Sequence, residues 1–409
     1  MIDKYYNGVI EQVVSGIGNV EHNSILVRYS NDFSIWDLES VNHYKDQSDI
    51  FFTCHEFSYN KIAEAYEPYL GLIRQMFHRY CSGTLEEFME ECDVYKLQRP
   101  VFESYFEKGF CERTEQILID EVEYEQERMC NSIVTMLQKL SEIRPVVIVL
   151  NRFQLASKST MQLTNSLLQV KNKNIGIVLG VNDVQSIPEF AHEEWDAICE
   201  SMDDRNMVYH IGNAGRNMEP DVMDYYSDYE SDDGYRKLNN LVYFLDFDQA
   251  NHHLSKIERR IKFDNFTISE KKHYQLLLLQ IMVSVLQRDI AKALESCEDL
   301  EKLQDQEKEG AFYYNFWMAT SYMYLGKLEE AMIYVQKAKE CGEALGDDFL
   351  VFRAELLKAQ NQMSGWCNIF FCAQDIEISD KLIEKLNAYH YKNHLAHIYF
   401  YAYDNKPEI

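Results

Sequence analysis

Three histidines near the end of the chain have a spacing that could bind a metal ion. His390, His394 and His397 lie at positions i, i+4 and i+7, so a helix would carry all three imidazoles on one face. Imidazole nitrogens are common zinc ligands. The same segment is rich in tyrosine, including Tyr389 and Tyr391, and this composition favours an aromatic packing face of a helical repeat. We therefore predict no metal site and keep the three histidines as the alternative.

Hydroxyl and carboxylate side chains form two further groups that could do chemistry. Ser157, Ser159 and Thr160 have no G-x-S-x-G turn around them, so we predict that they cap the following helix. The acidic residues between 213 and 236 have the composition of a calcium loop. Their glycine, Gly234, lies one position late for an EF-hand, and we predict an acidic linker instead.

Short apolar runs in the first half predict the strands of a buried sheet. Runs that are apolar at nearly every position suit parallel strands covered on both faces. Amphipathic stretches between the runs predict helices, and the alternation of strands and helices indicates an α/β domain. We expect this domain to span residues 1–212. The predicted strands are residues 24–29, 50–54, 146–150, 174–181 and 207–211.

After residue 237 the sequence has a helical pattern, and one segment resembles a TPR unit. Tyr322 would be the large residue of its first helix, and Gly326 would end that helix. Ala331 and Ala338 would let the second helix approach the first closely. The resemblance implies paired helices, and each pair leaves an apolar face that only a neighbouring repeat can cover.

Alanines at longer intervals mark weaker copies of this unit. Ala293 lies 38 residues before Ala331, and Ala250 lies another 43 residues before Ala293. A standard TPR unit has about 34 residues, so the spacing indicates the longer, irregular repeats of bacterial regulators. We predict an acidic linker at 213–236 and an all-α TPR-like superhelix at 237–409 that binds a protein or peptide.

The segment 144–160 resembles the Walker B region of STAND-class signal-transduction ATPases, which are AAA-type and origin-recognition-like. It holds an apolar strand, a polar turn and a helix in the family's order. Residues 65–70 look like the Tyr-x-Pro segment after the family's second strand, and Asn182 stands where its sensor strand ends. The resemblance covers about residues 8–212. It implies a three-layer, P-loop-NTPase-like domain with a mainly parallel sheet, and TPR-like repeats after it agree with the family's domain order.

The residues that ATP hydrolysis requires are missing from this pattern. A phosphate-binding loop needs glycines, a lysine and a Ser or Thr, but residues 30–40 after the first strand include no Gly and no Lys. Asn151 and Arg152 stand where the family has its two Walker B acids. An amide brings no charge to Mg²⁺, and a guanidinium accepts no proton. We predict no catalytic residue and no cofactor, with Asn151, Arg152 and Asn182 as vestigial positions.

The charge of the chain restricts its partners. With 67 acidic and 40 basic side chains, the formal net charge is −27, which repels a nucleic-acid backbone and an acidic membrane surface. The N-terminus does not have the pattern of a signal peptide, and no apolar run approaches the length of a membrane span. The 10 cysteines include no CxxC pair. We expect reduced thiols and a cytoplasmic location.

These features together predict a non-hydrolysing signalling or scaffold protein. Its ATPase-derived module is retained for its shape, and its TPR-like array binds a protein or peptide. One alternative is a nucleotide-sensing STAND-type regulator that binds ATP or ADP without efficient hydrolysis, and another is an enzyme with a pocket elsewhere. Members of the family often carry an output domain after such modules. We expect such a domain beyond residue 409, or a homo-oligomer, as a further partner.

Overall fold

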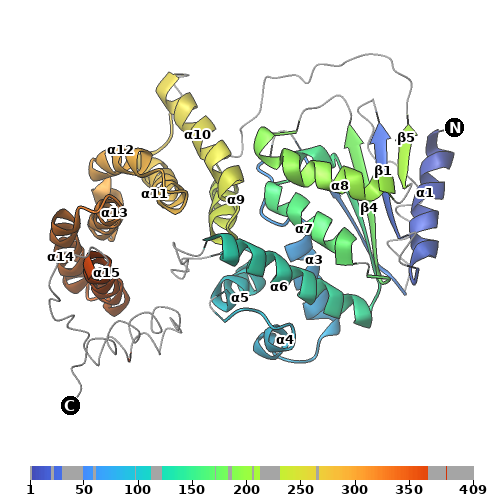
Figure 1. Cartoon of the computed structure of the whole chain (residues 1–409), viewed down its shortest axis with the longest axis horizontal. Helices are drawn as coiled ribbons and strands as arrows, with labels where there is room; N and C mark the ends of the chain where they lie inside the picture. The colour runs from blue at the N-terminus through green and yellow to red at the C-terminus, as the bar shows by residue number, and fades with distance from the viewer. Residues whose placement is uncertain are drawn as a thin grey trace. The chain divides into compact units, whose positions relative to one another are not determined.

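The computed structural model divides the chain into two units (Figure 1). The first, called here the α/β unit, ends at Ala250, and the second, the helical unit, begins at Asn251. The residues that the structure describes are 2–19, 23–29, 49–58, 61–96, 98–111, 122–170, 172–182, 187–204, 207–211, 231–263, 267–366 and 384.

The α/β unit contains a five-stranded parallel sheet, as the sequence predicts. The strands lie in the order β2-β3-β4-β1-β5, and every neighbouring pair runs parallel. β3 and β4 are buried at every position, which explains why their sequences show no polar alternation. The strands are β1 (Ser24–Tyr29), β2 (Phe51–Glu56), β3 (Val146–Asn151), β4 (Ile175–Asn182) and β5 (Val208–Ile211).

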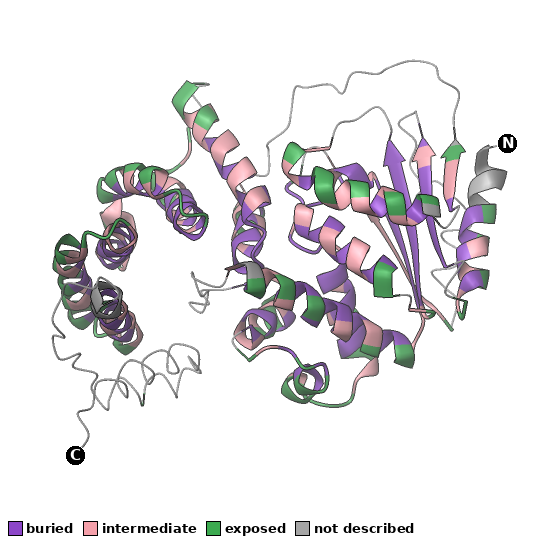
Figure 2. Cartoon of the chain, in the orientation of Figure 1, coloured by how far each residue is buried: buried purple, intermediate pink, exposed green. Residues whose placement is uncertain are grey.

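Helices cover this sheet, and one of them approaches it very closely. Helix α1 packs on β4 at Gly176, where a Cβ atom would lie 2.7 Å from Cγ1 of Val13. In Figure 2 the outward sides of α6, α7 and α8 carry the exposed residues, while β4 is buried. The helices are α1 (Ile2–Gly16), α3 (Tyr69–Tyr80), α4 (Leu85–Glu91), α5 (Arg99–Lys108), α6 (Val122–Ile143), α7 (Lys158–Val170) and α8 (His192–Asp204).

The described residues after the sheet are helical, as the sequence predicts. None of these helices, nor any other in the described part of the chain, has the length and apolarity of a membrane span. The helices are α9 (Asp232–Tyr243), α10 (Phe247–Phe263), α11 (Glu270–Leu286), α12 (Ile290–Glu301), α13 (Gly310–Tyr324), α14 (Leu328–Leu345) and α15 (Asp348–Trp366).

Helix α9 belongs to the α/β unit, whereas the sequence-based division placed residues 237 onward in the repeat domain. The reason is the packing of Phe244, which follows α9 and is fully buried. Its ring meets those of Tyr66, Phe102 and Tyr105 edge-on, at centroid distances of 6.3, 5.8 and 5.5 Å. Asn240 of α9 also donates a hydrogen bond to Oε2 of Glu64 (3.0 Å).

Most of the predicted acidic linker, residues 213–230, lies outside the described residues. Its last residues form the start of α9, where the Ser231 hydroxyl accepts a hydrogen bond from the backbone N–H of Gly234 (2.9 Å). Serine at this position satisfies a backbone donor that the first turn of a helix leaves unpaired. A side-chain cap therefore fixes the start of α9.

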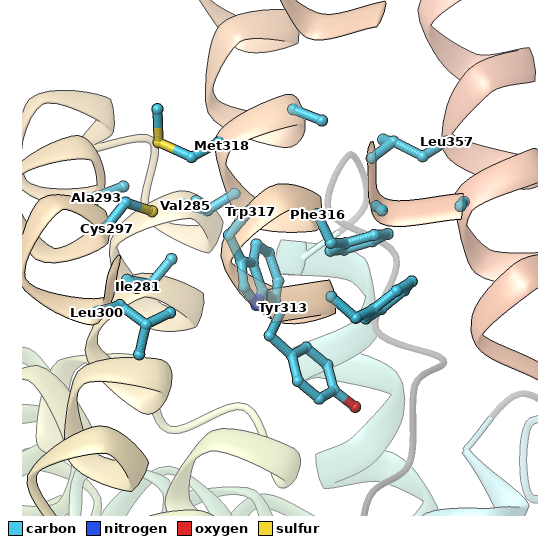
Figure 3. Close-up of a cluster of buried hydrophobic side chains, with 14 of the residues drawn as sticks. Ile281, Val285, Ala293, Cys297, Leu300, Tyr313, Phe316, Trp317, Met318 and Leu357 are labelled. Atoms are coloured by element: carbon cyan, nitrogen blue, oxygen red, sulfur yellow. The ribbon is translucent and has the colours of Figure 1, made fainter. Parts of the chain in front are cut away.

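An aromatic core on α13 holds the helical unit together. Phe312 is fully buried, and Phe316 and Trp317 are 8% and 5% exposed. Figure 3 shows Trp317 beside the small side chains of α12, with Phe316 on the side of Leu357 from α15. Large rings on one helix thus contact helices before and after it, which is the packing that repeat arrays require.

Candidate functional site

The carboxyl end of β3 holds a buried amide at the position where the resemblance expects an acid. Asn151 is the last residue of β3 and is fully buried. Its Oδ1 accepts a hydrogen bond from the hydroxyl of Tyr29 (2.9 Å), and its Nδ2 lies 3.5 Å from Oε1 of Glu56. Tyr29 ends β1, and β4 lies between β1 and β3. Tyr29 pairs with Asn182, the last residue of β4, and Leu150 pairs with Leu179, so the phenol crosses β4 to hold the amide.

Arg152 follows with a backbone that few side chains adopt. Its φ and ψ angles are 53° and 42°, in the left-handed region that is uncommon for residues other than glycine. Its Nε lies 3.5 Å from Oε1 of Glu56. The same carboxylate thus contacts both residues at the two vestigial positions.

The third predicted position, Asn182, lies at the same edge of the sheet. It ends β4, and its backbone N–H donates to Oε1 of the fully buried Gln154 (3.2 Å). The structure therefore places Asn151, Arg152 and Asn182 at the same edge of the sheet. The predicted degenerate loop, residues 30–40, lies outside the described residues.

This edge offers little of the chemistry of an ATPase. An amide and a guanidinium occupy the two positions, and both are engaged by Glu56. Neither group can supply a carboxylate to Mg²⁺ or accept a proton from water. Sequence reasoning did not find the role of Tyr29 or Glu56, because the pairing depends on strand order.

Of the three hydroxyl side chains predicted to cap the next helix, Ser157 caps α7, whereas Ser159 and Thr160 bind the segment before α3. Oγ of Ser157 accepts the backbone N–H of Thr160 (3.3 Å) and donates to the carbonyl of Glu64 (2.9 Å). Oγ of Ser159 accepts the backbone N–H of Tyr66 (3.2 Å). These hydroxyls join the start of α7 to the segment before α3.

A carboxylate that sequence reasoning missed reaches the same helix start. Oδ2 of Asp246 accepts the backbone N–H of Ser159 (2.8 Å), and Oδ1 accepts that of Gln249 (3.3 Å). Asp246 is 4% exposed, and burial raises the pKa of its carboxyl. An Asp directly before a helical pattern is an N-cap signal, so its bond within α10 was detectable, but the bond to α7 was not.

Glu64 and Glu67 belong to the segment between β2 and α3, and His55 of β2 lies close to Glu67. Nε2 of His55 lies 3.4 Å from Oε1 of Glu67. Burial lowers the pKa of His55 to about 4, so this contact joins a neutral imidazole to the carboxyl group at pH 7. Burial also raises the pKa of Glu64 to about 7 and raises that of Glu67. The raised pKa of Glu64 predicts that the stability of this segment depends on pH near neutrality.

The predicted repeat residues lie at three equivalent turns between helices. Each turn has one residue with a left-handed backbone. The backbone N–H of the residue after it donates to the carbonyl of the residue five positions before that donor, at N–O distances of 2.8, 2.8 and 2.9 Å. A fully buried alanine follows five residues after the left-handed residue. The left-handed residues are Leu245 (φ 66°), Arg288 (φ 62°) and Gly326 (φ 71°), and the alanines are Ala250, Ala293 and Ala331.

Two further signature residues lie on α13 and α14. Ala338 is fully buried in the core. Tyr322 is half-buried, and its ring stacks on that of Tyr334 with a centroid distance of 5.5 Å. Nζ of Lys327 lies 5.6 Å from the centre of the Tyr322 ring. The signature residues thus contact each other's helices as paired helices would.

The candidate zinc ligands His390, His394 and His397 lie outside the described residues. In the part of the chain that the structure describes, no group of three or more His, Cys, Asp or Glu side chains could hold a metal ion.

No protein-family model, curated protein or solved structure matches the chain.

Proposed function

We propose that this protein is a non-hydrolysing signalling or scaffold protein, in which an ATPase-derived module precedes a TPR-like array that binds a protein or peptide. The buried amide of Asn151 is the observation that supports an ATPase-derived module without hydrolysis. Its amide is fully buried and hydrogen-bonded to Tyr29 at the end of β3. A metal-binding carboxylate would have to stand at this position for Mg²⁺-dependent hydrolysis.

The sheet supports descent from a nucleotide-binding module. In parallel α/β sheets, ligands bind at the carboxyl ends of the strands, and the positions that resemble Walker B and sensor residues lie there, at the ends of β3 and β4. Every neighbouring pair of strands runs parallel, which agrees with the mainly parallel sheet that the resemblance implies.

The three equivalent turns support the second half of the proposal. The same left-handed residue, hydrogen bond and buried alanine recur before α10, α12 and α14. Helix pairs that repeat in this way stack into arrays, and such arrays bind partners on extended surfaces. A protein or peptide is therefore the partner class that we propose.

A nucleotide titration tests the proposal. The full chain is heated with Mg²⁺ and ATP, ADP or GTP at millimolar concentration, and phosphate release is measured on the same samples. A nucleotide at a hundred times its Kd would stabilise the fold by about 2.7 kcal/mol, which raises Tm by several degrees. We expect no shift and no hydrolysis.

The other outcomes separate the alternatives. A saturable shift with ATP or ADP and no hydrolysis would identify the nucleotide-sensing regulator. Hydrolysis by the protein that disappears in R152A would overturn the proposal. Hydrolysis that is equal in R152A and elutes together with the protein would identify the alternative of an enzyme with a pocket elsewhere, because Arg152 lies at the site in question.

A further inference from the structure

One buried carboxylate caps two helices at once. Asp246 accepts the backbone N–H of Ser159 near the start of α7 and that of Gln249 near the start of α10, at 2.8 and 3.3 Å. The first backbone donors of a helix have no partner within the helix, and a carboxylate there also interacts favourably with the helix dipole. Asp246 therefore satisfies a first-turn backbone donor of each helix, while Ser157 satisfies another donor of α7, the N–H of Thr160.

The equivalent residues of the other two repeat turns do not have this role. Asp289 is exposed, and its Oδ1 accepts only the backbone N–H of Lys292 in its own helix (3.2 Å). Lys327 makes no side-chain cap. The double cap is therefore a feature of the first turn alone among the three, and the general geometry of the turn does not require it.

The two capped helices lead to different parts of the chain. Helix α7 follows Asn151 and Arg152 after a short turn at Phe153–Leu155. Helix α10 begins in the α/β unit and continues to Phe263, beyond the division at Ala250. A side chain that fixes both helix starts links the strand end at the vestigial site to the first helix that enters the helical unit.

Two further contacts hold the turn between α9 and α10 within the α/β unit. Nε2 of Gln126 on α6 donates to the carbonyl of Leu245 (2.8 Å). Nζ of Lys158, the first residue of α7, lies 2.7 Å from Oδ2 of Asp248 in the first turn of α10. This ion pair is partly exposed and contributes little by itself, so the buried Asp246 is the main link between the two helices.

We propose that Asp246 is a coupling joint, which makes the first turn of α7 and the first turn of α10 open and close together. Displacement of either helix removes a hydrogen bond from a buried carboxylate, so each helix favours the closed state of the other. The proposed function gives this joint its use, because a signal at the α/β unit would reach the array through α10. The mechanical coupling itself does not depend on that function.

Hydrogen exchange of the full chain, read by mass spectrometry, tests the joint with matched substitutions. In D246A, we expect peptides from the first turns of α7 and α10 both to exchange at least about fivefold faster, as the loss of a helix cap implies. In D289A, only peptides from α12 should change. Exchange that rises in only one of α7 and α10 in D246A would overturn the proposal.

A second pair of variants keeps the test valid if D246A does not fold. Asparagine is a good N-cap, so D289N should leave α12 within about twofold of the native rate. An amide has only one acceptor oxygen, so D246N can cap only one of the two helices, and at least one should exchange faster. Native rates at both helices in D246N, or an equal rise throughout the chain, would contradict the joint. No nucleotide or peptide is used, so this result is separate from the test of the proposed function.

Discussion

The hydroxyl of Tyr29 donates a hydrogen bond to Oδ1 of Asn151 at 2.9 Å, and both side chains are buried. The bond joins the ends of β1 and β3, which are not neighbours in the sheet. In a chain that resembles an ATPase, the loop after β1 and the acids after β3 would cooperate on Mg²⁺ and phosphate. Here a phenol and an amide satisfy each other, so the contact supports a structural role for this edge.

Substitution Y29F is expected to destabilise the α/β unit by about 1–2 kcal/mol, because a buried amide oxygen loses a donor. The free energy of unfolding in urea measures the effect. Y209F is a matched control: the Tyr209 hydroxyl donates to Gln12 at 2.9 Å, but the residue is only half-buried, so water can replace the bond. Equal losses of unfolding free energy in the two variants would show that the hydrogen bond to Asn151 stabilises the fold no more than a half-buried one.

Substitution N151D places a carboxylate at the end of β3 and is expected to be harmful. The new charge would be buried beside Glu56, whose Oε1 lies 3.5 Å from the present amide. We expect a loss of roughly 2 kcal/mol or more at pH 7, and a smaller loss at pH 5. Adding E56Q should recover part of the loss. Recovery of the stability of N151D by millimolar Mg²⁺ would contradict a purely structural role for this edge of the sheet.

The sheet could be predicted because its strands carry an unambiguous signal. Val146–Asn151 is apolar at its first five positions, and the structure buries all of them. The end of the first unit could not be predicted in the same way. It depends on Phe244 meeting Tyr66 and Phe102, which lie far away in the sequence, and a local pattern contains no such information.

The sequence allowed three positions of the candidate site to be named, but not their contacts. Asn151, Arg152 and Asn182 lie at the ends of the apolar runs that predict β3 and β4, and parallel strands bring them to one edge. The pairing of Asn151 with Tyr29 requires knowledge that β1 lies next to β4. Asp246 shows the same limit, because its cap within α10 is local in sequence, whereas its bond to Ser159 spans 87 residues.

Glu64 should make the α/β unit less stable as pH rises from about 4.5 to 7. Burial raises its pKa in the folded protein from 4.5 to about 7, so the folded state binds a proton that the unfolded state has released. Stability from this group is full below pH 4.5 and is lost as pH rises through 7, up to about 3 kcal/mol. E64Q cannot lose a proton. Relative to the native protein, E64Q should gain free energy of unfolding in urea between pH 5 and 8. If the unfolding free energies of the two proteins change with pH in parallel, Glu64 does not have the raised pKa.

His253 should have the opposite effect on the helical unit. Its side chain is buried, and burial lowers its pKa from 6.5 to about 3. The unfolded state therefore binds more protons between these values, and stability falls as pH falls below 6.5, by about 2 kcal/mol at pH 5. With Trp36, Trp195 and Trp366 replaced by Phe, the fluorescence of Trp317 can follow unfolding of this unit. In H253Q, the free energy of unfolding should fall between pH 7 and 5 by about 2 kcal/mol less than in the native protein. An unchanged fall would show that His253 is not responsible.

Ala331 provides a direct test of the repeat interpretation. It is fully buried at the start of α14, where the equivalent turns place an alanine against the preceding helix. A331L adds three carbon atoms to this contact and should destabilise the helical unit by about 1–3 kcal/mol, because a packed core cannot accept them without strain. A344L is the matched control on the same helix, where Ala344 is exposed, and its effect should stay within about 0.5 kcal/mol.

If the alanine marks a repeat, A293L at the equivalent turn should resemble A331L in Tm and in urea unfolding. A loss in A331L without a comparable loss in A293L would separate the two turns and argue against a common repeat.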